Sequence, residues 1–217
     1  MTETTKYIGG EYKVLQQFGG AMGHVFLVEK QGIGFPFVLK SYQDIKPHLE
    51  ELFFTEVKNW TSFGVHQNIV KTLFAEKFDG KIFVAAEFVE GKENGENRLT
   101  NYIGKNLPLH LIIKWAVQFS YGMNHCLGKG MIAHSDIKPD NILIDKDLNL
   151  KITDFGLSKS YLNDEHSGGG TAMYFSPEQI YNSEKIDYRS DIYSFGIVLY
   201  QLITKGVFPY QLSSNNW

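Results

Sequence analysis

The most informative stretch of this 217-residue chain reads HSDIKPDN at residues 134–141, and DFG follows at residues 154–156. A lone aspartate in such a stretch would ordinarily be a solvated turn residue, but several chemical groups occur here together. Phosphoryl transfer needs a carboxylate beside the attacking hydroxyl, oxygen ligands for magnesium, and positive charge near the moving phosphate. That set of groups is supplied by Asp136, Asn141, Asp154 and Lys138.

This stretch resembles the catalytic loop and the metal-binding triplet of the eukaryotic-type (Hanks-type) protein kinases, whose signatures are H-R-D-L-x-x-x-N and D-F-G. The resemblance implies that Asp136 is the catalytic base or orients the acceptor hydroxyl, and that Lys138 lies near the γ-phosphate. It also implies that Asn141 and Asp154 bind Mg²⁺. A lysine at position 138 is typical of the serine/threonine branch of the family rather than the tyrosine branch.

FVLK at residues 37–40 resembles the V-A-I-K motif on the family's third strand, which makes Lys40 the expected partner of the α- and β-phosphates of ATP. By this resemblance Lys40 pairs with a carboxylate on the following helix. Glu56 is the preferred partner because it lies ten residues before the run HQNIV that begins at His66, with Glu50 and Glu51 as alternatives. A strand-edge lysine without a function is the other interpretation of Lys40, and the neighbouring motifs argue against it.

FGGAMGHV at residues 18–25 resembles the family's phosphate-binding loop, G-x-G-x-x-G-x-V. Phe18 stands where the first glycine belongs, unless one residue is deleted and Gly19 takes that role. Glycine lets backbone amides approach phosphate oxygens closely. A glycine-rich hairpin without a ligand is common, but the position of this one, two strands before Lys40, favours phosphate binding. The aligned positions are Gly20, Gly23 and Val25.

VAAEFVEG at residues 84–91 resembles the segment that joins the family's two lobes. The resemblance implies that backbone groups of Glu87 and Val89 hydrogen-bond the adenine of ATP, and that Ala86 guards a back pocket. Apolar side chains would enclose the base, and these are Val25, Val38 and Leu143. Because Val38 is bulkier than the usual alanine, this pocket is expected to be tight.

Two later motifs complete the resemblance. GTAMYFSPE at residues 170–178 resembles the peptide-receiving segment G-T-x-x-Y-x-A-P-E, with Ser176 in place of alanine and Thr171 supporting the serine/threonine assignment. DIYSFG at residues 191–196 resembles D-x-[WY]-S-x-G, whose aspartate braces the catalytic loop. An internal column of stacked side chains is expected from Trp60, His134 and Phe155.

Strand and helix patterns divide the chain into a strand-rich first part and a helical second part. Strands are expected at residues 12–18, 25–29, 35–40, 69–78 and 81–88, with a helix at 47–64. After a polar boundary at 91–97, helices are expected at 109–127 and 191–204, and short strands at 142–144 and 150–152. The fold class is α+β: a two-lobed protein-kinase-like fold, with an ATP-binding lobe at residues 1–90 and an incomplete, mostly helical catalytic lobe at residues 91–217. A ligand-binding cleft is expected between the lobes.

Composition narrows the functional classes. The net charge is −3, whereas a dedicated nucleic-acid binder would show a basic excess, so no nucleic-acid partner is expected. Cys126 is the single cysteine, which fits a reducing compartment and predicts a cytoplasmic protein. No apolar run is long enough to span a membrane. The oligomeric state is not indicated.

The chain departs from the family pattern in two places. Ser135 replaces the arginine of H-R-D, which normally pairs with a phosphorylated residue, so activity is expected not to require such phosphorylation. The resemblance ends near Tyr210, before the family's last helices, so the chain is expected to be a fragment of a longer protein, with a truncated version of the family's fold as the alternative. Glu178 would then lack its usual arginine partner, and apolar surface would be exposed after Ile203. Sites that could still be modified are Ser158, Ser160, Ser167 and Thr171.

The sequence therefore predicts a protein serine/threonine kinase that uses ATP and Mg²⁺ and acts on protein hydroxyl groups. The alternative is a catalytically weak pseudokinase or nucleotide-binding scaffold, although the residues implied for catalysis are all present. A small-molecule kinase of related fold is a third possibility, and the peptide-receiving segment at residues 170–178 argues against it.

Overall fold

The computed structural model describes residues 6–19, 24–42, 45, 47–92, 97–155, 172–181 and 186–210, and the chain divides into two compact units. Among the described residues, the first unit contains those up to 65 together with 70–88. The second unit contains residues 66–69 and those from 89 onwards. The domain limits of 1–90 and 91–217 stay a prediction, and the turn at 66–69 is the segment that departs from simple sequence order.

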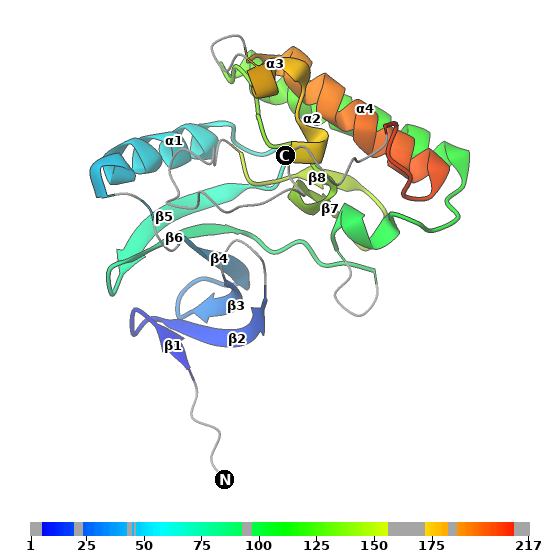
Figure 1. Ribbon diagram of the computed structural model, residues 1–217. Helices are drawn as coiled ribbons and strands as arrows, with labels where there is room; N and C mark the ends of the chain where they lie inside the picture. Colours follow the sequence, from blue (N-terminus) through cyan, green and yellow to red (C-terminus); the bar gives the residue numbers. More distant parts are fainter. Residues whose placement is uncertain are drawn as a thin grey trace. The chain divides into compact units, whose positions relative to one another are not determined.

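The first unit is built on a six-stranded antiparallel sheet with the strand order β1-β2-β3-β4-β6-β5 (Figure 1). The five strands expected from the sequence all form. β5 starts later than expected, at Thr72, and Ile69 instead forms a bridge with Ile152 inside the second unit. The strands are β1 (Tyr7–Ile8), β2 (Tyr12–Phe18), β3 (Val25–Lys30), β4 (Phe37–Tyr42), β5 (Thr72–Phe78) and β6 (Lys81–Glu87).

Alternation along β4 decides which side chains enter the core of the first unit. Phe37 and Leu39 are fully buried, whereas Val38 and Lys40 lie half-buried on the opposite face. The buried face packs into a cluster of apolar side chains with Tyr12 at its centre; the ring of Tyr12 meets that of Phe37 edge to face at 5.9 Å. The sheet thus has one face committed to the core and one that presents Lys40.

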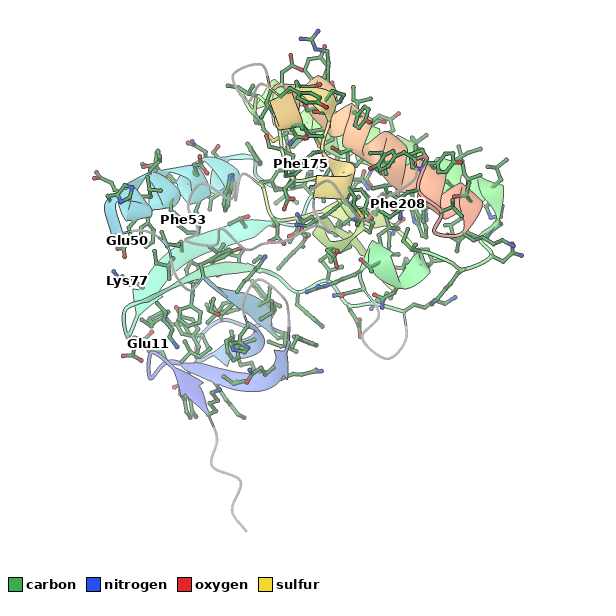
Figure 2. The ribbon with its side chains drawn as sticks, viewed as in Figure 1. Glu11, Glu50, Phe53, Lys77, Phe175 and Phe208 are labelled. Carbon is green, nitrogen blue, oxygen red and sulfur yellow. The ribbon has the colours of Figure 1, made fainter. Side chains whose placement is uncertain are left out.

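α1 (Glu50–Ser62) follows a short 3₁₀ turn, η1 (Pro47–Leu49), and packs against β5. Its apolar face buries Phe53, whose ring lies 5.3 Å from that of Tyr42 on β4. At the start of the helix the Glu50 carboxylate accepts a 2.8 Å ion-pair bond from Lys77 on β5, and Figure 2 shows these two side chains directed towards each other. This helix and the sheet therefore form one packed body.

The second unit is organised around α2 (Leu109–Gly128) and α4 (Tyr188–Thr204), which pack together (Figure 1). Phe119 and Phe195 stack between them, with ring centroids 3.7 Å apart. α2 also packs on a hairpin made of β7 (Ile142–Ile144) and β8 (Leu150–Ile152), both as predicted. The remaining elements are η2 (Leu99–Tyr102), η3 (Pro139–Asn141), η5 (Ala172–Tyr174) and α3 (Pro177–Tyr181).

Residues at the ends of α4 explain its limits. The Asp187 carboxylate accepts a 2.9 Å bond from the backbone N–H of Arg189 and caps the helix start. The helix ends at Lys205, which adopts a left-handed conformation with φ of 60°. Ile203 near this end is 59% exposed. Within the described part of the chain, no helix is both long and apolar enough to cross a membrane.

Candidate active site

Asp136 lies at the centre of a short network in the second unit. Lys138 donates to both of its carboxylate oxygens, at 2.8 Å and 3.1 Å. The side-chain amide of Asn141 donates to the Asp136 carboxylate at 2.8 Å and to its backbone carbonyl at the same distance. The Lys138 side chain is only 6% exposed and that of Asp136 is 18% exposed, so the pair is close to solvent but largely enclosed. Three of the residues predicted for catalysis and metal binding are therefore in direct contact.

Asp191 on α4 holds the backbone of the catalytic loop. Its two carboxylate oxygens accept from the backbone N–H groups of His134 at 2.7 Å and Ser135 at 2.8 Å. The side chain is buried, and this burial raises the pKa of Asp191 above its usual value, while the two N–H bonds act in the opposite direction. The bracing role expected for this aspartate is confirmed by the geometry.

His134 connects the loop to the strand that leads into Asp154. Its Nδ1 accepts from the backbone N–H of Asp136 at 3.3 Å, and its Nε2 lies 2.9 Å from the carbonyl oxygen of Thr153. The ring must therefore carry its proton on Nε2, which donates to Thr153. The imidazole also packs against Phe155, with ring centroids 4.9 Å apart. Trp60, the third member of the expected column, packs against Phe53 within the first unit.

The β7–β8 hairpin explains how Asn141 and Asp154 come to the same place. Asn141 precedes β7 and Asp154 follows closely after β8, and the two strands pair in register from Ile142 opposite Ile152. The backbone N–H of Thr153 donates to the carbonyl of Asn141 at 3.0 Å, which closes this end of the hairpin. Asp154 itself adopts a left-handed conformation with φ of 61°, unusual for a residue other than glycine.

The donor set at this end of the hairpin fits Mg²⁺. Because the amide nitrogen of Asn141 donates to Asp136, its side-chain oxygen is directed away from Asp136. One amide oxygen and one carboxylate are hard oxygen ligands, and Mg²⁺ commonly takes only one or two carboxylates from a protein and the rest from phosphates and water. Among the described residues there is no group of three or more His, Cys, Asp and Glu side chains that could hold a metal alone.

In the first unit, strand pairing gathers the predicted nucleotide-binding residues on one face of the sheet. Val25 on β3 lies opposite Lys40 on β4 and also opposite Phe18 on β2, and directly paired residues share a face. Val38 joins the same face because it is two residues from Lys40 on β4. Phe18, which stands at the first glycine position of the loop motif, stacks on Phe88 with ring centroids 6.5 Å apart. Gly19 is described, whereas Gly20 and Gly23 lie outside the described residues.

The three carboxylates considered as partners of Lys40 have different surroundings. Glu50 is bonded to Lys77 and Glu51 is exposed. Glu56 lies on the half-buried side of α1, and one of its carboxylate oxygens is inaccessible to solvent. These surroundings favour Glu56 as the partner of Lys40, an assignment that stays a prediction.

The residues expected to contact adenine already use part of their backbone bonding capacity. Glu87 donates its N–H to the carbonyl of Lys71 at 2.9 Å. The carbonyl of Val89 accepts from the Asn97 side chain at 2.8 Å. The contacts predicted for these residues therefore fall on the carbonyl oxygen of Glu87 and the N–H of Val89. Leu143 lies half-buried at the middle of β7.

The segment at residues 172–181 is held by hydrogen bonds to α4 and to the catalytic loop. Ser194 donates to the carbonyl of Tyr174 at 2.6 Å, and the Tyr174 hydroxyl donates to Gln201 at 2.8 Å. Burial raises the pKa of Tyr174 to about 12. The Ser190 hydroxyl donates a 2.5 Å hydrogen bond to the Glu178 carboxylate. This bond lowers the pKa of Glu178 and gives the carboxylate a hydrogen-bond partner within the chain. Thr171 and Gly156 lie outside the described residues.

One residue of this segment was not anticipated from the sequence. Gln179, which follows the Ser176-Pro177-Glu178 run, donates from Nε2 to the carbonyl of Ser135 at 2.8 Å. Its Oε1 accepts from the backbone N–H of Ser176 at 3.0 Å. The pattern S-x-x-Q at residues 176–179 is a known helix-start signature and could have indicated the second contact. No local pattern indicates the first.

The chain belongs to the protein kinase family, since the family model of the protein kinase domain matches residues 12–216. A probable serine/threonine-protein kinase of Clostridium perfringens is 33% identical over 94% of this chain and 30% of its own length. The serine/threonine-protein kinase PrkC of Bacillus subtilis is also 33% identical, over 92% of this chain and 31% of its own length. This chain thus spans about 30% of the length of these relatives.

The fold agrees with that assignment. A crystal structure of a variant of the PknI kinase domain of Mycobacterium tuberculosis superposes with a TM-score of 0.75 at 20% sequence identity. The match covers 97% of this chain and 80% of that one. The predicted α+β kinase fold, with a curled antiparallel sheet and a helical unit, is therefore confirmed.

Proposed function

We propose that this chain is an ATP-dependent protein serine/threonine kinase domain, which transfers the γ-phosphate of ATP to serine or threonine hydroxyl groups of protein substrates. The observation that carries the proposal is the Asp136 network, in which one carboxylate is bonded to both Lys138 and Asn141. The kinase names of its relatives support the same function.

In the proposed reaction, the acceptor oxygen attacks the γ-phosphorus while the bond to the bridging oxygen of ADP breaks. Asp136 orients the hydroxyl and receives its proton. Lys138 has three N–H donors, so it can keep a bond to Asp136 while donating another to the transferred phosphoryl group. These groups act mainly by positioning and charge stabilisation, as expected for phosphoryl transfer.

Bound Mg²⁺ would neutralise charge on the phosphates, and Asn141 and Asp154 are the proposed ligands. Asn141 also fixes the Asp136 backbone through its amide nitrogen, so one side chain would serve both the metal and the catalytic carboxylate. We assign Lys40 to the α- and β-phosphates, with Glu56 as its partner. Gly19, Gly20 and Gly23 are assigned to the phosphates; Phe18, Val25, Val38, Leu143 and backbone groups of Glu87 and Val89 are assigned to the adenosine part.

The test is transfer of radiolabelled γ-phosphate to a generic basic protein by the wild-type chain and by Asp136→Asn. The variant should lose about 10²- to 10⁴-fold in transfer rate, which is the usual contribution of a positioned acid–base group. Its binding of a fluorescent ATP analogue with Mg²⁺ should be unchanged. Asp147→Asn, an equivalent change at an exposed aspartate of the β7–β8 turn, is the matched control and should keep full activity.

Nucleotide binding by the wild-type chain without any transfer would instead support the pseudokinase alternative. Full transfer by Asp136→Asn would refute the role assigned to that carboxylate. We also propose a cytoplasmic location, which the single, buried cysteine supports.

A further inference from the structure

Gln179 and Ser176 form a reciprocal pair at the start of α3. The backbone N–H of Ser176 donates to Oε1 of Gln179 at 3.0 Å, and the backbone N–H of Gln179 lies 3.4 Å from the Ser176 hydroxyl. This is the arrangement of a capping box, in which residues three apart satisfy each other's backbone donors. Ser176 is fully buried, so the orientation of the Gln179 amide is set by a group that cannot turn to solvent.

The other end of the same amide reaches the catalytic loop. Nε2 of Gln179 donates to the carbonyl oxygen of Ser135 at 2.8 Å. Ser135 has a φ of 66°, in the left-handed region that residues other than glycine rarely adopt. Its carbonyl belongs to the peptide group that leads into Asp136, and the nitrogen of that group donates to His134 at 3.3 Å. Gln179 and His134 thus hold the two polar atoms of one peptide group.

We propose that Gln179 is a positioning residue for Asp136, an inference that rests on the proposed kinase function. The orientation of a peptide group determines where the next side chain points, so a bond at the Ser135 carbonyl acts on the Asp136 carboxylate. A side-chain amide offers an acceptor for Ser176 and a donor for Ser135 at once, whatever the pH. The residue therefore links the segment at 172–176 to the catalytic loop through uncharged groups.

Two variants distinguish the hydrogen bond between Gln179 and Ser176 from the one between Gln179 and Ser135. Gln179→Met removes both bonds while keeping a side chain of similar length. Gln179→Glu keeps an acceptor for Ser176 but places a second oxygen against the Ser135 carbonyl when it is ionised. The matched control is Gln118→Met, because Gln118 on α2 also bonds at both ends, to Asn149 at 3.1 Å and to the Leu150 N–H at 2.9 Å.

Amide hydrogen exchange gives a readout that does not depend on activity. Gln179→Met should exchange about tenfold faster over residues 133–141 than the wild type, because the peptide group between Ser135 and Asp136 loses the bond that holds its carbonyl oxygen. Gln118→Met should leave exchange over these residues unchanged. In kinetic assays of the same proteins, Gln179→Met should lower kcat about tenfold without changing the Kd for the ATP analogue.

The pH profile of Gln179→Glu tests the hydrogen bond that residue 179 donates to the Ser135 carbonyl. A protonated carboxyl group can donate its O–H to Ser135 while its other oxygen accepts from Ser176, so it reproduces the amide. Because an unperturbed glutamate titrates near pH 4.3 and burial raises this value, the ratio of variant to wild-type kcat should rise as the pH falls from about 8 to 5. The ratio for Gln179→Met should stay constant over that range.

The proposal is overturned if Gln179→Met matches Gln118→Met in both exchange and kcat, or if the Gln179→Glu ratio does not change with pH. Failure of the kinase function would look different: the wild-type chain would then transfer no phosphate. In that case the exchange comparison alone decides the role of Gln179, since it measures the order of the loop directly.

Discussion

Asp191→Asn tests the support of the catalytic loop most directly, because it replaces one buried oxygen atom with an NH₂ group and hardly changes the side-chain volume. The amide can accept only one of the two backbone N–H bonds, from His134 or Ser135, and it presents an NH₂ group to the other donor. A hydrogen bond to a charged group contributes about 1.5–3 kcal/mol. Replacing the carboxylate also removes the burial cost that raises the pKa of Asp191, so the net loss should be near the lower end, about 2 kcal/mol.

For a chain of this size, that loss corresponds to a decrease in melting temperature of about 4–8 °C, measured by calorimetry or circular dichroism. Displacing the loop should also lower kcat about 10- to 100-fold, since small misplacements of catalytic groups are costly. Asp187→Asn on the same helix is the control. It should melt within about 2 °C of the wild type, because asparagine caps a helix as well as aspartate does and the ion pair lost with Arg189 is exposed.

The reasoning is refuted if Asp191→Asn melts within about 1 °C of the wild type and keeps its kcat. That outcome would mean that the two N–H bonds to Asp191 do not hold the loop. A loss of stability with unchanged kcat per folded molecule would confine Asp191 to a structural role.

Two further predictions concern packing and pH. Gly9→Ala should destabilise the first unit by about 1–3 kcal/mol in urea unfolding. Gly9 has a φ of 55°, and an added Cβ would lie 2.4 Å from the ring of Phe78. An unchanged urea midpoint would contradict this prediction and show that the turn can move. His66 stacks on His125 at 4.6 Å, and burial, with the charge of His125, lowers the pKa of His66. A histidine with a lowered folded pKa binds more protons in the unfolded state, so the free energy of unfolding should fall as the pH drops through the unfolded pKa of about 6.5. His66→Gln should flatten this dependence of the unfolding free energy between about pH 7 and 5.5.

Much of the catalytic loop could be predicted because its chemistry is local in sequence. Asp136, Lys138 and Asn141 lie within six residues, and the 3₁₀ turn η3 brings their side chains together. The face shared by Val38 and Lys40 follows from alternation along one strand. At these positions the side chains that form the site are close together in the sequence. Their contacts could therefore be predicted without knowing which distant segments pack together.

Other features could not be predicted because they depend on contacts between distant segments. β1 has only two residues, too few to show an alternating pattern, and its pairing with β2 is what defines it. The stacking of His66 on His125 joins a turn to a helix nearly sixty residues away. The contact between Gln179 and Ser135 spans 44 positions and ends on a backbone carbonyl, which carries no signature in the sequence of side chains.

Two positions at which the chain differs from the family's motifs, Ser135 and Ser176, are joined through that last contact. Ser135 lacks the cationic side chain of the family's arginine, yet its backbone carbonyl is held by Gln179, and Gln179 is oriented by Ser176, which stands in place of alanine. An arginine–phosphate pair depends on a modification and, where exposed, weakens with salt. A neutral bond to a backbone carbonyl depends on neither a modification nor a charge. Because the bond between Gln179 and Ser135 is present in the unmodified chain, we expect an ordered catalytic loop without phosphorylation.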